Sequence, residues 1–152
     1  MAKNILQKMV VLMAIVLLTA CENVRFNESS PIPSWPVSYT LNIMQDEPLL
    51  TVAGGYYEIT EITDYNQYIG YGGLLVFHGF DDNFYAYDMS CPYECATDTL
   101  IVASMVGTAV CSHCGSTYDV GFGSGYPTEG PSEYPLRQYT VRSSGYYLYI
   151  TQ

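Results

Sequence analysis

The sequence predicts an all-β domain made of small antiparallel sheets, and three observations support this. Tyrosine is unusually frequent, with 16 residues beside 13 glycines and eight prolines, as in domains of short strands and many turns. Short alternating or apolar segments recur, separated by glycine, asparagine and aspartate. No segment after residue 20 keeps a 3.6-residue period, so we expect no long helix. The length of 152 residues corresponds to one domain.

The charge balance excludes several partners. Residues 1–20 contain Lys3 and Lys8 and no acid, so the rest of the chain carries three basic and 15 acidic residues. Such an acidic surface repels phosphate groups, so we expect no nucleic-acid binding and no polybasic attachment to anionic lipid. A composition with 49% hydrophobic and 13% charged residues also excludes a disordered chain.

The N-terminus predicts export and lipid attachment. Lys3 and Lys8 precede an apolar run, Met9 to Leu18, that is short for a membrane span and typical of a signal peptide. The sequence Leu18-Thr19-Ala20-Cys21 resembles the lipobox of bacterial lipoproteins. The resemblance implies that residues 1–20 are removed, that Cys21 carries the lipid, and that the protein is anchored to a membrane of the bacterial cell envelope, which we expect to be the outer membrane. The alternative is an ordinary signal peptide followed by a coincidental cysteine.

A proline-rich segment follows Cys21. Pro31, Pro33 and Pro36 prevent a helix and favour an extended spacer, so residues 21–36 are expected to form a tether. Trp35 is either part of that tether or the first residue packed on the domain. The β domain is expected to span residues 37–152.

Within this domain, short strands alternate with turn residues. Alternating β-formers predict the first strand, and the apolar run Leu74-Leu75-Val76-Phe77 predicts a buried one. Turns or loops are predicted at Gly54-Gly55, across 60–73 and at 79–83. The expected strands are 37–43, 49–53, 56–59, 74–77, 84–87, 100–103, 108–110, 138–142 and 146–150.

Four cysteines of the domain follow the spacing C-x3-C-x15-C-x2-C: Cys91, Cys95, Cys111 and Cys114. Two close pairs, each next to a strand, can bring four sulfurs together at the tips of two loops, as a tetrahedral thiolate site requires. Four thiolates suit zinc or iron. From spacing alone, disulfides are an equal alternative, because an even number of cysteines in a small exported domain often means bridges.

The residues around these cysteines resemble the Rieske [2Fe–2S] domain. Gly115-Ser116-Thr117-Tyr118-Asp119 follows Cys111 and Cys114, and Gly130-Pro131 and Pro135-Leu136 come later. The Rieske family has C-x-H in one loop, C-x-x-H-G-S-x-F-D in the other, and a G-P-…-P-L loop over the cluster. The resemblance covers about residues 72–151 and implies Rieske-like small antiparallel sheets with two cysteine-bearing loops. It also implies cluster ligation by Cys91 and Cys111, with support from Gly115, Ser116, Tyr118, Gly130 and Pro131.

Both histidine ligands of the Rieske pattern are missing. Tyr93 stands at the first position, Cys114 at the second, and His113 is one residue out of register. The two histidines on one iron raise the potential of a Rieske centre, so that tuning cannot occur here unchanged. Three chemistries stay open. The first is a site of Cys91, Cys95, Cys111 and Cys114 that holds zinc or a [2Fe–2S] cluster. The second is disulfides without a cofactor. The third is a redox-active Cys111–Cys114 dithiol, for which the sequence lacks an activating helix.

Other catalytic patterns are absent from the sequence. It has no Ser/His/Asp set in a recognisable context, no nucleotide-binding glycine fingerprint and no His-x-x-x-His pair, so we expect no catalytic residues. The leading hypothesis is an envelope lipoprotein that binds a metal or an iron–sulfur cluster and passes electrons to a redox partner. The alternative is a structural or binding lipoprotein whose cysteines form a zinc site or disulfides, and whose tyrosine-rich surface meets a protein partner.

Overall fold

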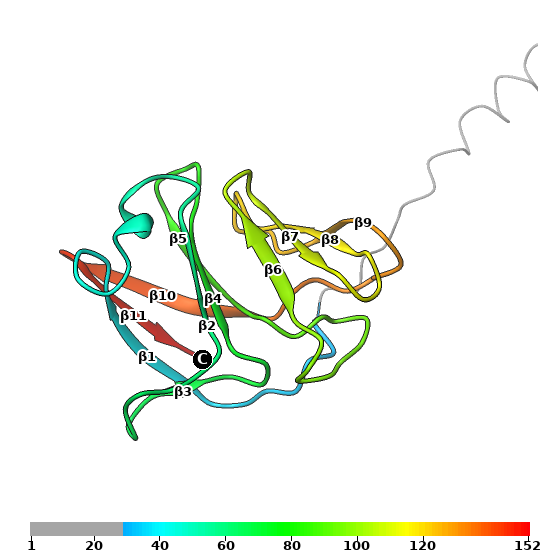
Figure 1. Cartoon of the computed structure of the whole chain (residues 1–152), viewed down its shortest axis with the longest axis horizontal. Coiled ribbons are helices and arrows are strands. Elements are labelled where there is room, and N and C mark those ends of the chain that lie inside the picture. Colours follow the sequence, from blue (N-terminus) through cyan, green and yellow to red (C-terminus); the bar gives the residue numbers. More distant parts are fainter. Residues whose placement is uncertain (1–28) are drawn as a thin grey trace, which may run out of the picture.

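The computed structural model describes residues 29–152, which fold into two antiparallel sheets (Figure 1). The larger sheet has the strand order β2-β4-β5-β10-β11-β1-β3, and the smaller one has the order β6-β7-β8-β9. The all-β class is therefore confirmed. The bounds are β1 Val37–Asn42, the 3-10 helix η1 Pro48–Thr51, β2 Tyr56–Ile59, β3 Tyr68–Ile69, β4 Leu74–His78, β5 Phe84–Asp88, β6 Ile101–Ser104, β7 Thr108–Cys111, β8 Thr117–Asp119, β9 Pro127–Glu129, β10 Gln138–Ser144 and β11 Tyr147–Thr151.

Strand β10 connects the two halves of the larger sheet. Its first residues, Gln138 and Tyr139, pair with β5, and residues 140–144 pair with β11. In Figure 1 the group β2, β4 and β5 stands at a steep angle to the group β1, β10 and β11. The small sheet lies beside the first group, where the Glu58 carboxylate of β2 accepts a hydrogen bond from the Ala103 N–H of β6 over 2.8 Å.

The core lies on both faces of β4. Leu75 and Phe77 belong to a cluster shared with the small sheet, which includes Tyr118. Leu74 and Val76 point into a second cluster with the strands of the other half. Because successive strand residues face opposite sides, a strand buried on both faces reads as a continuous apolar run. The prediction of a buried strand at 74–77 is confirmed.

One expected strand, 49–53, is wrong, because the 3-10 helix η1 occupies residues 48–51. The Glu47 carboxylate accepts a hydrogen bond from the Leu49 N–H over 3.3 Å, and the Thr51 hydroxyl donates to the Pro48 carbonyl over 2.7 Å. Proline at the first helical position has its φ already fixed for a helix. These local interactions outweigh the β-forming tendency of leucine, threonine and valine.

Three short strands lie in segments where no strand is predicted. They are β3, within the loop expected at 60–73, and β8 and β9, on either side of the glycine-rich turn. Each has only two or three residues, too few to show an alternating pattern.

The predictions for the signal peptide 1–20, for Cys21 and for residues 22–28 of the tether lie outside the described residues. The end of the predicted tether is packed on the domain, because Ile32 is buried and its carbonyl accepts a hydrogen bond from Arg137 Nε over 2.8 Å. Trp35 is half-exposed and contacts Tyr71 edge to face. Packing therefore begins at Ile32, before the expected boundary at residue 37. No helix within residues 29–152 is long and apolar enough to cross a membrane.

Candidate metal centre

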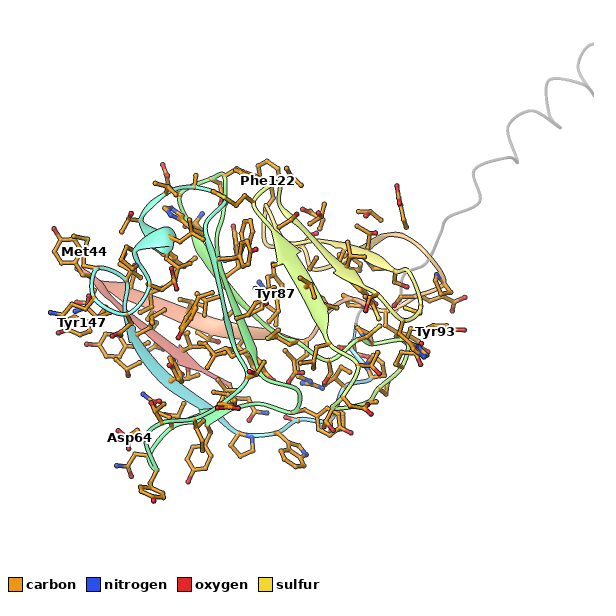
Figure 2. All side chains as sticks on the ribbon, viewed as in Figure 1. Met44, Asp64, Tyr87, Tyr93, Phe122 and Tyr147 are labelled. Carbon is orange, nitrogen blue, oxygen red and sulfur yellow. The ribbon has the colours of Figure 1, made fainter. Side chains whose placement is uncertain are left out.

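Two loops carry the four cysteines of the domain to one end of the small sheet. The first loop joins β5 to β6 and contains Cys91 and Cys95, and the second follows Cys111 at the end of β7. Pairing of Ile101 with Cys111 and a bridge between Ser90 and Leu100 hold the loops side by side. Figure 2 labels Tyr93, an exposed residue of the first loop.

Both loops make the same turn. The Cys95 N–H donates to the Cys91 carbonyl over 2.8 Å, and the Gly115 N–H donates to the Cys111 carbonyl over 2.9 Å. Both turns end in the left-handed region, with φ of 52° at Cys95 and 76° at Gly115. Cys95 is therefore the counterpart of Gly115, and the counterpart of Cys114 in the first loop is Glu94.

Three of the four sulfurs lie together. The Sγ atoms of Cys91, Cys111 and Cys114 are all within 4.8 Å of one another, and those of Cys91 and Cys114 are 3.6 Å apart. Cys95 is exposed, and its Sγ donates to the Pro92 carbonyl over 3.0 Å instead. The extra residue in its C-x3-C spacing places Cys95 at the turn end, outside this group of three, which we call the thiol cluster.

Buried hydroxyl groups contact the thiol cluster. The Tyr118 hydroxyl is 3.4 Å from Cys91 Sγ, and the Ser116 hydroxyl is 3.2 Å from Cys114 Sγ. Burial raises the pKa of Tyr118, so the hydroxyl keeps its proton and can donate it in a hydrogen bond to the sulfur. Both residues are among those that the sequence predicted to support the site.

The loop after β9 lies against the second cysteine loop. The Ser132 N–H donates to Ser116 Oγ over 3.1 Å. Gly130 has a φ of 89°, and a Cβ atom there would lie 2.5 Å from the Ser116 Cα. Only glycine allows this approach, whereas Pro131 is exposed. The contact of this loop with the second cysteine loop therefore depends on Gly130, which the sequence indicated, and on Ser132, which it did not.

The three cysteines with resolved shifts differ in acidity. Burial raises the pKa of the Cys91 thiol to about 12, although its hydrogen bond with Tyr118 acts in the opposite direction. Burial also raises the pKa of Cys95, with a further contribution from the Glu94 charge. At Cys114 the effect of burial is outweighed by hydrogen bonds to the hydroxyl and N–H of Ser116, so its pKa is lowered. Cys114 therefore forms a thiolate more readily than Cys91 or Cys95.

An ion pair joins the two loops beside the thiol cluster. His113 Nδ1 lies 2.8 Å from the Glu94 carboxylate, which raises the pKa of His113 through the hydrogen bond and the charge. The His113 side chain is mostly exposed and serves this link. The sequence contains a signal for this pair, since Glu94 and His113 each directly precede the second cysteine of their loop.

A buried acid positions the first loop, and the sequence did not point to it. Asp88, the last residue of β5, accepts hydrogen bonds from the N–H groups of Tyr71, Gly72 and Ser90 and from the Tyr139 hydroxyl. Ser90 directly precedes Cys91. The Asp88 carboxylate thus fixes the point where the first cysteine loop leaves the sheet.

The thiol cluster fits one tetrahedral ion. With metal–sulfur bonds of about 2.3 Å, tetrahedral sulfur ligands lie about 3.8 Å apart. The 3.6 Å between Cys91 and Cys114 agrees with this value. A four-cysteine [2Fe–2S] cluster needs a fourth thiolate, and Cys95 Sγ is directed at Pro92. The described residues therefore supply three of four ligands, in an arrangement that suits a single ion.

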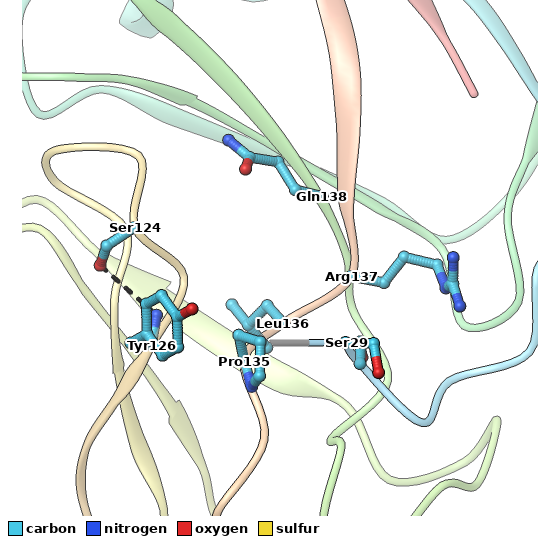
Figure 3. A pocket seen from close by; sticks show the side chains of 8 residues that line it. Ser29, Ser124, Tyr126, Pro135, Leu136, Arg137 and Gln138 are labelled. Atoms are coloured by element: carbon cyan, nitrogen blue, oxygen red, sulfur yellow. Dashed lines mark hydrogen bonds between the residues drawn. The ribbon is translucent and has the colours of Figure 1, made fainter. Parts of the chain in front are cut away.

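A pocket of about 340 Å³ lies where the covering loop enters β10 (Figure 3). Arg137 is the charged residue among the described residues that line it. Its guanidinium is turned toward the Ile32 carbonyl, away from Ser124 and Tyr126. The pocket therefore belongs to the packing of this loop and is no part of the thiol cluster.

The fold and the site together define a small all-β domain with a thiol cluster held between two loops. No protein-family model and no curated protein sequence matches the chain. Among solved structures, it is similar to a chain from the "complex of reduced oxygenase and oxidized ferredoxin in carbazole 1,9a-dioxygenase", with a TM-score of 0.44 and 19% identity over 64% of this chain and 81% of that one. It is also similar to a Sphingomonas yanoikuyae B1 ferredoxin, with a TM-score of 0.42 and 18% identity over 62% of this chain and 84% of that one. The chemistry of the site rests on this chain's own geometry.

Proposed function

We propose that this chain is a lipid-anchored protein of the bacterial cell envelope whose β domain binds a metal centre through Cys91, Cys111 and Cys114 and transfers electrons. One observation carries the metal centre, which is that three sulfurs from two separate loops lie within 4.8 Å of one another. Thiolates that converge in this way form a binding site for a metal ion. Burial disfavours a charged thiolate at Cys91 unless a cation lies beside it.

The surrounding residues prepare the thiol cluster for a metal. Thiols must lose their protons to bind a metal, so binding releases protons and weakens at low pH. Ser116 favours the thiolate of Cys114, and the Tyr118 hydroxyl, 3.4 Å from Cys91 Sγ, can donate to a thiolate there. Bound iron would supply a one-electron couple, and bound zinc would supply none.

Attachment and partner are parts of the same proposal. The lipobox-like sequence ending in Cys21 supports lipid attachment, and we place the domain at the outer membrane. The formal net charge of −10 supports a redox partner with a basic docking surface, because complementary charge speeds association.

The second candidate function is a structural zinc site in a binding lipoprotein. The sulfur spacing favours it, since the thiol cluster suits one ion better than a two-iron cluster. In this case the metal stabilises the loops, and binding occurs on another surface.

Voltammetry and metal analysis of the full chain, purified without oxygen in detergent, separate the two candidates. Electron transfer predicts bound iron, charge-transfer absorption in the visible range and a reversible one-electron couple. Zinc without a couple would contradict electron transfer and support the structural site. No metal together with a Cys91–Cys114 disulfide would contradict both.

A further inference from the structure

The thiol cluster supplies three of the four ligands that a tetrahedral ion takes, and the turn shared by the two cysteine loops indicates the fourth. The first residue of each turn, Cys91 or Cys111, belongs to the cluster. The second loop also contributes the fourth residue of its turn, Cys114, and the residue at this position in the first loop is Glu94. A carboxylate oxygen is an ordinary zinc ligand beside cysteine sulfur. The first loop therefore has a carboxylate where the equivalent position of the second loop has a ligand.

Burial follows the same pattern in both turns. The third residues face solvent, because Tyr93 is 54% exposed and the His113 side chain is 69% exposed. The fourth residues are more enclosed, since the Glu94 side chain is only 23% exposed and Cys114 is partly buried. Enclosed carboxylates are stabilised by hydrogen bonds, by opposite charges or by metal ions. The fourth position of the first turn is therefore better suited than the third to hold a ligand.

The Glu94 carboxylate is already attached to the second loop. Its Oε1 atom lies 2.8 Å from Nδ1 of His113, and its Oε2 atom has no hydrogen-bond partner among residues 29–152. The carboxylate lies outside the group of atoms within 4.8 Å of one another, so it reaches an ion at the cluster by rotation about its own side-chain bonds. Metal-ligating carboxylates are usually hydrogen-bonded by a second residue, and His113 is in place to do this.

The neighbouring residues suit the fourth ligand position less well. Cys95 lies at the end of its turn, where its Sγ donates to the Pro92 carbonyl over 3.0 Å. His113 lies at the exposed third position, and its Nδ1 contacts Glu94. We propose that Glu94 is the fourth ligand of an ion bound at the thiol cluster, an inference that rests on the metal centre proposed above.

Cobalt(II) provides the assay, because it occupies the same sites as zinc and iron(II) and its absorption reports the ligands around it. The full chain is purified without oxygen in detergent, freed of metal with a chelator and titrated with Co²⁺. Charge-transfer absorption in the near ultraviolet, which grows with the number of thiolates, should correspond to three of them. Azide should leave the visible bands unchanged, because Glu94 holds the position that azide would take.

Two variants of Glu94 test the ligand itself. Glu94→Gln should weaken Co²⁺ binding by more than about tenfold, since even the loss of a residue that orients a metal ligand costs about 10–100-fold. Azide should then change the visible bands. Glu94→Cys should raise the near-ultraviolet absorption to that of four thiolates, because its sulfur would match Cys114 of the second loop. Asp98→Asn is the matched control, since it removes an exposed charge of the same loop that also acts on His113, and it should bind like the native chain.

The outcomes separate the fourth ligand from the metal centre. Azide binding by the native Co²⁺ form, binding by Glu94→Gln within about tenfold of the native chain, or three-thiolate absorption in Glu94→Cys would overturn the role of Glu94 and leave the metal centre standing. A native chain that binds no Co²⁺ would contradict the metal centre and this proposal together. Circular dichroism checks that each variant is folded, and if Glu94→Gln is not, Glu94→Cys and the azide response of the native form decide.

Discussion

Replacing Asp88 with asparagine is expected to destabilise the domain and loosen the first cysteine loop. Asp88 is fully buried and accepts four hydrogen bonds, from Tyr71 N at 2.7 Å, Gly72 N at 3.0 Å, Ser90 N at 2.9 Å and the Tyr139 hydroxyl at 2.8 Å. It therefore connects the loop before β4, the start of the first cysteine loop and β10.

The size of the effect follows from how the donors are divided. Oδ1 serves Gly72 and Ser90, while Oδ2 serves Tyr71 and Tyr139. Asparagine has a single oxygen, so its NH2 group would face one pair of donors. The Tyr139 hydroxyl can rotate and accept from that group, but a backbone N–H cannot. One unsatisfied buried donor costs about 1–3 kcal/mol, and weaker neutral bonds at the other donors bring the expected loss to about 3 kcal/mol.

Urea denaturation followed by circular dichroism measures this loss, with Asp98→Asn as the control. Asp98 is exposed on the same cysteine loop and accepts a long hydrogen bond, 3.5 Å from the Thr99 hydroxyl, so this variant should stay within about 0.5 kcal/mol of the native chain. Cys91 should also react faster with a thiol reagent in Asp88→Asn, because the Ser90 N–H loses part of its anchor. A loss below about 1 kcal/mol, or an equal loss in the control, would refute this role for Asp88.

Three further predictions concern other parts of the domain. In the metal-free chain, NMR titration should give His113 a pKa above its usual 6.5, and Glu94→Gln should bring it down. Since the folded-state pKa of His113 is raised, the ion pair stabilises the chain fully below pH 6.5, and its contribution is lost as the pH rises through the folded-state pKa. An unchanged His113 pKa in Glu94→Gln would contradict this role of Glu94. Gly123→Ala should lower the melting temperature well below that of Gly145→Ala, since both positions have positive φ but only Gly123 would place a Cβ against the Tyr85 ring; equal melting temperatures would contradict it. Ile32→Ala should cost about 2–4 kcal/mol in urea denaturation if packing begins at this residue, and a change near zero would show that it does not.

The sequence predicts most of the fold because the central strands have clear patterns. The apolar run at 74–77 and the β-formers at 84–87 give β4 and β5 nearly to the residue. The segment 49–53 could not be predicted in the same way, since Glu47 and Thr51 favour a 3-10 turn only through specific side-chain hydrogen bonds. Strands β8 and β9 exist because tertiary pairing orders segments too short to show a period.

The site is predictable in part, because its cysteines and the residues around them follow a recognisable pattern in the sequence. Spacing brings Cys91, Cys111 and Cys114 together, and the motif around them indicates Ser116 and Tyr118. The separation of Cys95 from this group depends on a turn that the two loops share, which becomes visible only when their backbone hydrogen bonds are compared. Asp88 is also hidden in the sequence, because its four donors come from segments up to 51 residues away.

The metal content of the full chain, purified without oxygen, tests whether the thiol cluster binds a metal. A site of this kind predicts about one ion per chain in the native protein. The ion should remain in Cys95→Ser, because Cys95 lies apart, and should be lost in Cys114→Ser. Equal metal content in both variants, or a native chain without metal whose Cys91 and Cys114 form a disulfide, would contradict a metal centre at these three sulfurs.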